Sequence, residues 1–212
     1  LWDRVYNALQ PGDYVTIQFG HNDISPIADK KKRGVIPSAK DTSKVFKLDN
    51  GQFELIYSYG WYLKKFIQDV REKGATPILV SLTPRNEWPG GKAERRNNSY
   101  GKWLAEVVKE TGVEFVDMHN ISADFLDSQF ANEKEYNKYN EKSKKYAAKG
   151  KEAKAKEAKE MARKVVAECK NQAWKYFKKD HTHTSIDGAR MNAQSFAKGL
   201  KENGSELAKY LK

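Results

Sequence analysis

Two short polar clusters contain three of the four histidines in the sequence. The first cluster is residues 20–23, Gly-His-Asn-Asp, and the second is residues 180–185, Asp-His-Thr-His-Thr-Ser. In the second cluster Asp180 precedes His183 by three residues. A carboxylate at that spacing in a turn can hold an imidazole ring in one tautomer and one orientation. The spacing therefore makes His183 a candidate general base, with Asp180 as the group that orients it.

Both clusters also have a simple structural interpretation. Residues 20–23 can be the polar turn that ends a strand, and Asp180 can be a capping carboxylate beside a surface histidine. His181 and His183 lie two residues apart, but no further cysteine or histidine has the spacing that would complete four zinc ligands. We therefore expect no metal site, and we expect the fourth histidine, His119, to be structural or peripheral.

Alternating strands and helices are expected to position these clusters. Residues 14–19 are β-branched and aromatic, which is typical of a buried strand that ends at the first cluster. Apolar periodicity and turn residues predict helices over 1–9, 53–73, 98–111 and 189–203, and strands over 77–81 and 113–117. This alternation is typical of an α/β fold with parallel strands joined by crossover helices. Ligands bind at the carboxyl ends of such strands, where residues 20–23 emerge.

The positive charge of the chain is concentrated in one region. The 212 residues carry 39 basic and 28 acidic side chains, a net charge of +11. Residues 131–179 contain 16 basic and 7 acidic side chains, so the rest of the chain is nearly neutral. We expect one long exposed helix over 141–168, with Cys169 as a small buried apolar residue on its inner face. Its lysines can form a solvated helix face or a strip that binds a polyanion.

The sequence argues against an internal disulfide, a membrane span and a retained signal peptide. A single cysteine cannot form an internal disulfide, and no stretch of roughly 18 apolar residues is present to span a membrane. The first ten residues lack the basic end and apolar core of a signal peptide.

Residues 24–52 are polar and rich in turn formers, with a basic run at 30–33, so we expect an irregular excursion there.

Taken together, the motifs resemble the SGNH (GDSL-like) hydrolases. The similarity is greatest to rhamnogalacturonan acetylesterases and related pectin deacetylases. It covers most of the chain outside the excursion and the lysine-rich helix. The resemblance implies a flavodoxin-like three-layer α/β/α fold with a parallel sheet. The segments that carry it are residues 11–15 (Pro-Gly-Asp-Tyr-Val), 20–23, 82–85 (Leu-Thr-Pro-Arg), 180–185 and 188–189 (Gly-Ala).

The resemblance also implies roles for individual residues. Asn22 corresponds to the side-chain amide that donates into the oxyanion hole, and Gly20 permits the tight turn that presents it. His183 corresponds to the general base that takes the proton of the serine nucleophile, and Asp180 to the acid that orients it. Arg85 and Trp88 lie in the loop after the second predicted strand. They are interpreted as substrate contacts, with Arg85 pairing with a galacturonate carboxylate and Trp88 stacking on a sugar ring. The alternative is that Arg85 is a structural arginine and Trp88 a packed tryptophan.

The sequence departs from the family at the nucleophile. The family's serine lies in a Gly-Asp-Ser motif after the first strand, and a glycine further on is a second oxyanion donor; neither segment occurs in the 212 residues. Ser25 and Ser81 do not stand in the strained strand-to-helix turn of a nucleophile. We therefore expect a single SGNH domain over 1–212 that lacks its N-terminal strands, is inactive alone, and carries a lysine-rich helical insertion at about 131–179.

Two functions remain open from the sequence. The first is a carbohydrate esterase that removes acetyl groups from a pectic polysaccharide such as rhamnogalacturonan, through a serine acyl-enzyme and without a cofactor. The resemblance then implies a secreted or periplasmic protein that acts on an acetylated polysaccharide. We expect no nucleic acid partner and no membrane partner. The oligomeric state stays open. The second function is a non-catalytic binding module that uses the basic helix to hold an acidic polymer.

Overall fold

The computed structural model describes residues 1–23, 25–29, 34–96 and 98–211. The basic run expected at 30–33 lies outside the described residues. The chain divides into two compact units. The strand unit comprises residues 1–82, 96–117 and 199–212, and the helical unit comprises residues 83–95 and 118–198. The sequence predicts one domain with an insertion at 131–179, and that segment lies within the helical unit.

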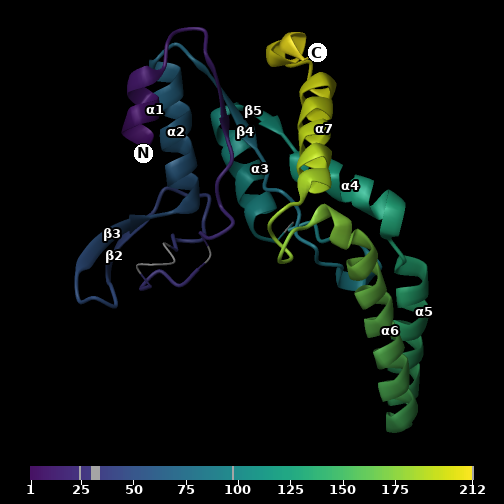
Figure 1. The fold of residues 1–212 in the computed structure, drawn as a ribbon. Coiled ribbons are helices and arrows are strands. Elements are labelled where there is room, and N and C mark those ends of the chain that lie inside the picture. The colour runs from purple at the N-terminus through teal and green to yellow at the C-terminus, as the bar shows by residue number, and fades with distance from the viewer. Residues whose placement is uncertain (24, 30–33, 97, 212) are drawn as a thin grey trace. The chain divides into compact units, whose positions relative to one another are not determined.

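A parallel sheet forms the centre of the strand unit (Figure 1). Its strands are β1 (Tyr14–Ile17), β4 (Thr76–Val80) and β5 (Glu114–Val116), in the order β1-β4-β5. Tyr14 lies opposite Thr76, and Ile78 lies opposite Glu114. The α/β class and the three predicted parallel strands are therefore confirmed.

The strand unit also contains the helices α1 (Trp2–Ala8), α2 (Tyr59–Glu72) and α3 (Tyr100–Thr111). Helices α2 and α3 bury apolar side chains, whereas α1 has none that is fully buried. The Trp2 indole N–H donates to Asp69 Oδ2 at 2.7 Å, which holds α1 beside α2 (Figure 1). Apolar residues at helical spacing supply the core. Its buried members are Ile17, Ala39, Tyr59, Leu63, Ile67, Leu79, Leu82, Tyr100, Leu104, Val107 and Val113.

Two expectations for the strand unit are wrong. Residues 24–52 are not irregular throughout, and the helix expected over 53–73 begins at Tyr59. Instead β2 (Ser43–Lys47) and β3 (Phe53–Tyr57) form an antiparallel hairpin. The physical reason is the loop at residues 48–52, in which Gly51 rather than Asn50 takes the positive φ that closes the hairpin. Gly51 has φ 82°, and Asn50 Oδ1 accepts a hydrogen bond from the Gln52 N–H at 3.1 Å.

The helical unit is built from helices and short 3₁₀ turns (Figure 1). Its elements are η1 (Pro89–Gly91), α4 (Met118–Phe130), α5 (Glu133–Ala147), α6 (Glu152–Gln172), η2 (Ala173–Tyr176) and most of α7 (Ile186–Glu202). The last turn of α7 and η3 (Glu206–Tyr210) belong to the strand unit. The last helix is thus confirmed with an earlier start than expected, whereas α4 is not among the predicted elements.

The single long helix expected over 141–168 is wrong, because this region forms two helices. In Figure 1, α5 and α6 lie side by side as a hairpin whose turn is residues 148–151. Gly150 has φ 64°, the left-handed conformation that commonly ends a helix. The Ser143 hydroxyl donates to the Ala155 carbonyl at 2.8 Å across the hairpin.

A separate apolar cluster holds the helical unit together. Cys169 is one of its members, 2% exposed, and burial raises the pKa of its thiol. Its expected role as a small buried apolar residue is confirmed. The buried members are Trp88, Ala93, Ala123, Leu126, Val165, Cys169, Ala173, Tyr176, Phe177 and Met191. Among the described residues, no helix combines the length and the apolar character needed to span a bilayer.

Candidate active site

Asp180 and His183 come together in one turn of the helical unit. The Asp180 Oδ2 atom lies 2.7 Å from His183 Nδ1, and Oδ1 accepts the backbone N–H groups of Thr182 at 2.7 Å and His183 at 2.8 Å. The His183 side chain is 78% exposed. With Nδ1 engaged by the carboxylate, Nε2 is the ring nitrogen that can exchange a proton with a reacting group.

The hydrogen bonds to Asp180 also fix its charge. The backbone N–H of His183, the His183 ring and the backbone N–H of Thr182, in that order, hold the pKa of the Asp180 carboxyl well below its usual range. Hydrogen bonds to a charged form stabilise that form. Asp180 is therefore an anion at neutral pH, as a group that orients an imidazole and stabilises its protonated form must be.

Short backbone contacts close the loop that carries His183. The Lys178 N–H donates to the His183 carbonyl at 2.8 Å, and the Ser185 N–H donates to the Tyr176 carbonyl at 3.1 Å. Close packing at Gly188, in the first turn of α7, completes the closure, because a Cβ there would lie 1.9 Å from the Tyr176 oxygen. A glycine is therefore required where α7 meets the end of η2.

Sequence reasoning missed Asn86, which joins the loop after β4 to the His183 loop. Asn86 is fully buried, and its backbone N–H donates to the His181 carbonyl at 2.7 Å. Its side-chain amide donates to the Lys170 carbonyl at the end of α6, at 3.0 Å, and its Oδ1 accepts the Trp88 indole N–H at 2.7 Å. Asn86 thus links three segments of the helical unit through buried polar groups. Only its place next to the Thr-Pro-Arg motif could have drawn attention to it.

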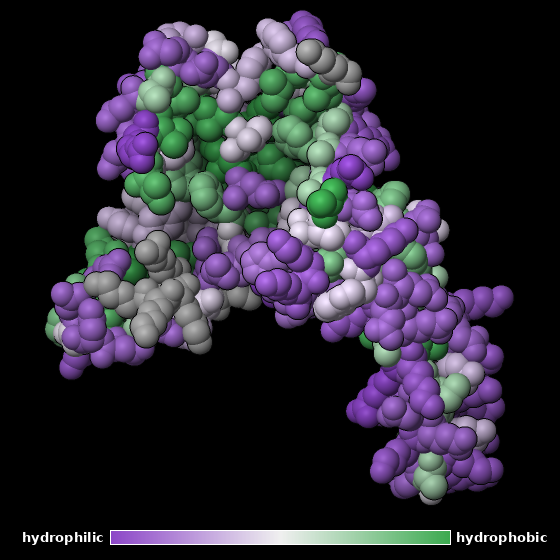
Figure 2. All heavy atoms as spheres, viewed as in Figure 1, coloured by the Kyte–Doolittle hydropathy of each residue, from purple (hydrophilic) through white to green (hydrophobic). Residues whose placement is uncertain are grey.

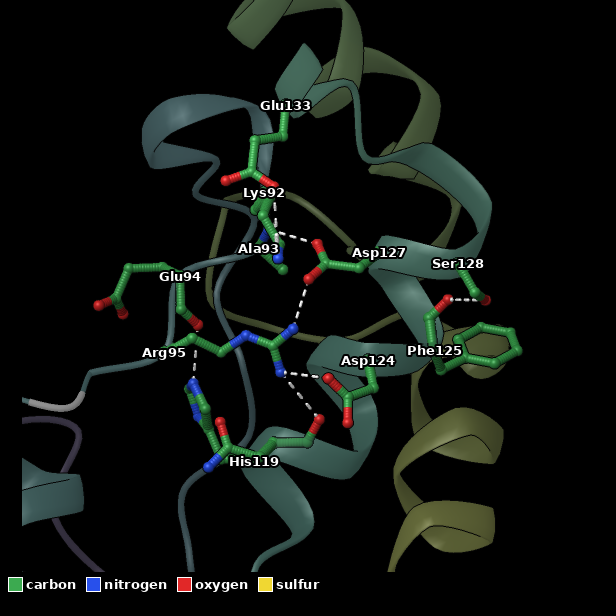
Figure 3. A network of polar contacts seen from close by, with 11 residues as sticks. Lys92, Ala93, Glu94, Arg95, His119, Asp124, Phe125, Asp127, Ser128 and Glu133 are labelled. Atoms are coloured by element: carbon green, nitrogen blue, oxygen red, sulfur yellow. Dashed lines mark hydrogen bonds and ion pairs between the residues drawn. The ribbon is translucent and has the colours of Figure 1, made fainter. Parts of the chain in front are cut away.

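A second polar network fixes the segment around residues 92–95 to α4 (Figure 3). The Arg95 guanidinium donates to Asp124 Oδ1 at 2.7 Å and also pairs with Asp127 Oδ2. The other Asp127 oxygen accepts the Ala93 N–H at 2.7 Å. His119 also belongs to this network, because its Nε2 lies 2.9 Å from the Glu94 carbonyl oxygen, and its side chain is buried. His119 is therefore a structural residue, one of the two roles expected for it.

The two residues expected near the substrate differ in burial. Trp88 is 2% exposed and packs in the apolar cluster of the helical unit, so it is the packed tryptophan of the two alternatives. Its ring presents no face on which a sugar could stack. Arg85 is partly exposed in the same loop, next to Asn86.

Gly20 and Asn22 lie in the strand unit, on the loop that follows β1. Gly20 has φ 142°, and a Cβ there would lie 3.0 Å from the Tyr100 ring and 3.2 Å from the Tyr59 ring. Both the conformation and the space therefore favour glycine. The Gly20 carbonyl accepts the Asp23 N–H at 2.9 Å in a tight turn that presents Asn22 as an exposed side chain.

Two side-chain hydrogen bonds hold the end of β1 beneath this turn. The Tyr59 hydroxyl donates to the Phe19 carbonyl at 2.9 Å, and the Gln18 amide donates to the Ser81 carbonyl at 2.7 Å. Burial raises the pKa of Tyr59, with a smaller contribution from the nearby Asp23 charge, so this hydroxyl keeps its proton. Burial also raises the pKa of the Asp23 carboxyl.

Both serines considered as substitute nucleophiles lie in the strand unit, whereas Asp180 and His183 lie in the helical unit. Ser81 is 4% exposed, and its hydroxyl donates to Asp117 Oδ1 at 3.0 Å. Ser25 lies in the turn after Asn22, where its N–H donates to the Asn22 carbonyl at 3.0 Å. The structure therefore brings Asp180 and His183 together in the helical unit, and places Gly20 and Asn22 together in the strand unit.

A parallel α/β sheet with an oriented histidine and an amide-bearing loop defines a hydrolase-type architecture. Residues 1–191 match the GDSL-like lipase/acylhydrolase family. The chain belongs to this family, which confirms the family predicted from the motifs.

Individual relatives agree with this assignment. A rhamnogalacturonan acetylesterase of Emericella nidulans is 23% identical over 97% of this chain and 68% of its own length. A probable rhamnogalacturonan acetylesterase of Bacillus subtilis, YesY, is 26% identical over 96% of this chain and 69% of its own length. An X-ray structure of another Bacillus subtilis protein superimposes with a TM-score of 0.56 at 17% identity, covering 95% of this chain and 40% of that one. That likeness concerns the fold alone.

Loss of the Asn86 side chain should destabilise the helical unit. In Asn86→Ala the Trp88 indole N–H and the Lys170 carbonyl would lose buried partners, and each unsatisfied group costs about 1–3 kcal/mol. We expect a reduced free energy of unfolding, measured by urea denaturation, and faster amide exchange in residues 180–185. Asn137→Ala, at an exposed position of α5, should change stability by less than about 0.5 kcal/mol. Equal effects of the two changes would contradict the linking role.

Acid should open the turn around Asp180. The pKa of the Asp180 carboxyl is lower in the folded chain than its ordinary value of about 3.9. The carboxylate therefore stabilises the turn fully above that ordinary pKa. This stabilisation is lost as the pH falls through the lower pKa of the folded chain. The amide proton shifts of Thr182 and His183, followed by NMR, should show an acid transition that lies well below pH 4. In Asp180→Asn this titration should vanish; its persistence would show that another group causes it.

Proposed function

We propose that this chain is the greater part of a carbohydrate esterase that removes acetyl groups from a pectic polysaccharide such as rhamnogalacturonan. The observation that carries the proposal is the 2.7 Å contact between Asp180 and His183, the residues to which the resemblance assigns the roles of the family's acid and base. The names of the relatives that match nearly the whole chain support the substrate class. The chain spans about two-thirds of the length of these relatives.

In the proposed reaction His183 Nε2 removes the proton from an attacking serine, and Asp180 stabilises the imidazolium that forms. The side-chain amide of Asn22 donates to the oxygen on which negative charge develops in the tetrahedral intermediate. His183 then returns its proton to the departing sugar hydroxyl. In the second half, His183 activates the water that releases acetate from the acyl-enzyme.

The nucleophile is the part of this proposal that the 212 residues do not supply. Under the proposal, the serine belongs to a Gly-Asp-Ser segment outside this sequence, and the chain alone is inactive. The burial of Ser81 and its bond to Asp117 support this reading over an internal replacement. No metal or other cofactor takes part in the route.

The location and one substrate contact follow from the same proposal. A polysaccharide does not diffuse through a membrane, so an enzyme that deacetylates it acts where the polymer is, and we place this protein outside the cell or in the periplasm.

Arg85 is proposed to pair with a galacturonate carboxylate, because it is partly exposed on the segment that Asn86 joins to the His183 loop.

The proposal is tested with a chimaera in which a Gly-Asp-Ser segment of the family precedes Leu1. It should release acetate from acetylated rhamnogalacturonan, and His183→Ala should lower kcat/KM by about 10³-fold or more. Asp180→Asn should also lower it strongly, because an amide can donate to Nδ1 and select the wrong tautomer.

The matched control is His181→Ala in the same loop. The His181 ring lies 3.7 Å from Glu87 rather than beside Asp180, so acetate release should change only a few-fold. An unchanged rate in His183→Ala would contradict the assignment of the base. Acetate release by the 212-residue chain alone, lost in Ser25→Ala, would contradict the external nucleophile.

A further inference from the structure

Four lysines form a row along one face of α5. Lys134, Lys138, Lys142 and Lys145 are separated by four, four and three residues, and all four are exposed. Side chains at such spacings lie one above another on a helix, here over about 16 Å of helix length. We infer that this row, the lysine ladder, is a docking surface for an acidic polysaccharide. The inference rests on the proposed function for the identity of the polymer and deepens it.

The lysine ladder faces away from the packing side of α5. Partly buried residues of the helix lie on another side, among them Tyr136, Tyr139, Ser143 and Tyr146. Ser143 contacts α6 through its bond to the Ala155 carbonyl. Figure 2 shows hydrophilic residues over most of the visible surface of the α5–α6 hairpin. The ladder is therefore open to a partner along its length.

The charge of α5 and of the turn that follows it is predominantly positive. Residues 133–151 contain seven lysines and three glutamates. One glutamate, Glu135, lies 3.0 Å from Lys138 and is held as an anion by that contact, which lowers its pKa. A polymer with carboxylates at regular intervals can therefore meet several cations at once, which increases its binding beyond that of a single exposed ion pair.

A partly buried aromatic ring borders the ladder on the packing side of α5. The Nζ atoms of Lys138 and Lys142 are 5.2 and 5.8 Å from the centroid of the Tyr139 ring. The part of the Tyr139 ring that stays exposed offers an apolar contact for a sugar ring, beside two ammonium groups that can pair with its carboxylate. This combination favours a uronate polymer. The absence of arginine from α5 argues against a site specialised for phosphate, which arginine binds bidentately.

The ladder is fixed to the same unit as the candidate base. At the root of the hairpin the Gly91 carbonyl accepts the Asn132 N–H at 2.9 Å, and the Cys169 thiol lies 3.9 Å from the same oxygen. The α6 end is joined to the His183 loop through Asn86 and the Lys170 carbonyl. A polymer held along α5 is thereby kept on the body that carries Asp180 and His183.

Binding without hydrolysis provides the test. The 212-residue protein is titrated with polygalacturonate and with neutral dextran, by isothermal titration calorimetry at low and at physiological salt. We expect binding to polygalacturonate that weakens with salt, and none to dextran. The quadruple change of Lys134, Lys138, Lys142 and Lys145 to Gln should weaken polygalacturonate binding about tenfold or more. Glutamine keeps good helix propensity, and circular dichroism checks the fold of each variant.

The matched control removes the same charge elsewhere. Lys44, Lys47, Lys102 and Lys109 are exposed lysines of the strand unit, and their change to Gln should leave the affinity within about twofold. Equal weakening in both variants would overturn the inference in favour of a diffuse charge effect. Absence of polygalacturonate binding by the unmodified protein, or tighter ladder-dependent binding of a single-stranded DNA oligonucleotide, would also overturn it. Acetate release by the chimaera is measured separately, so a failure of the proposed esterase function can be distinguished from a failure of the docking surface.

Discussion

The helical unit depends on the way in which one buried asparagine satisfies polar groups of distant segments. Asn86 is fully buried and contacts the His181 and Lys170 carbonyls and the buried Trp88 indole. A buried carbonyl without a partner is costly, so these segments are stable only when they meet at Asn86. The loop that carries His183 therefore owes its position to a residue that takes no part in proton transfer.

Local chemistry explains why the sequence predicted the acid and the base. Asp180 and His183 are three residues apart, and the carboxylate reaches the backbone and the ring within a single turn. Asn86 and Gly188 could not be predicted in the same way. Their importance comes from contacts with residues that lie 95 and 12 positions away along the chain, and only the folded chain brings these groups together.

The strands were predictable because buried parallel strands require continuous apolar and β-branched residues. Two errors have local causes that the sequence contains, since Asn50-Gly51 predicts a hairpin turn and Gly150 predicts the end of a helix. Strong helix formers on both sides of Gly150 obscured that break. The burial of Trp88 has no such local signal, because exposed and packed tryptophans look alike in a sequence.

The hydrogen bonds at the root of the α5–α6 hairpin end on main-chain oxygen atoms, beside the apolar side chains that pack there. The Gly91 and Lys170 carbonyls accept the bonds at its root, and a carbonyl is supplied by every residue type. Mutations on the exposed faces of the two helices therefore leave these bonds intact. In evolutionary terms the hairpin surface is free to diversify, and a new polymer specificity could arise there without any change in the residues that orient His183.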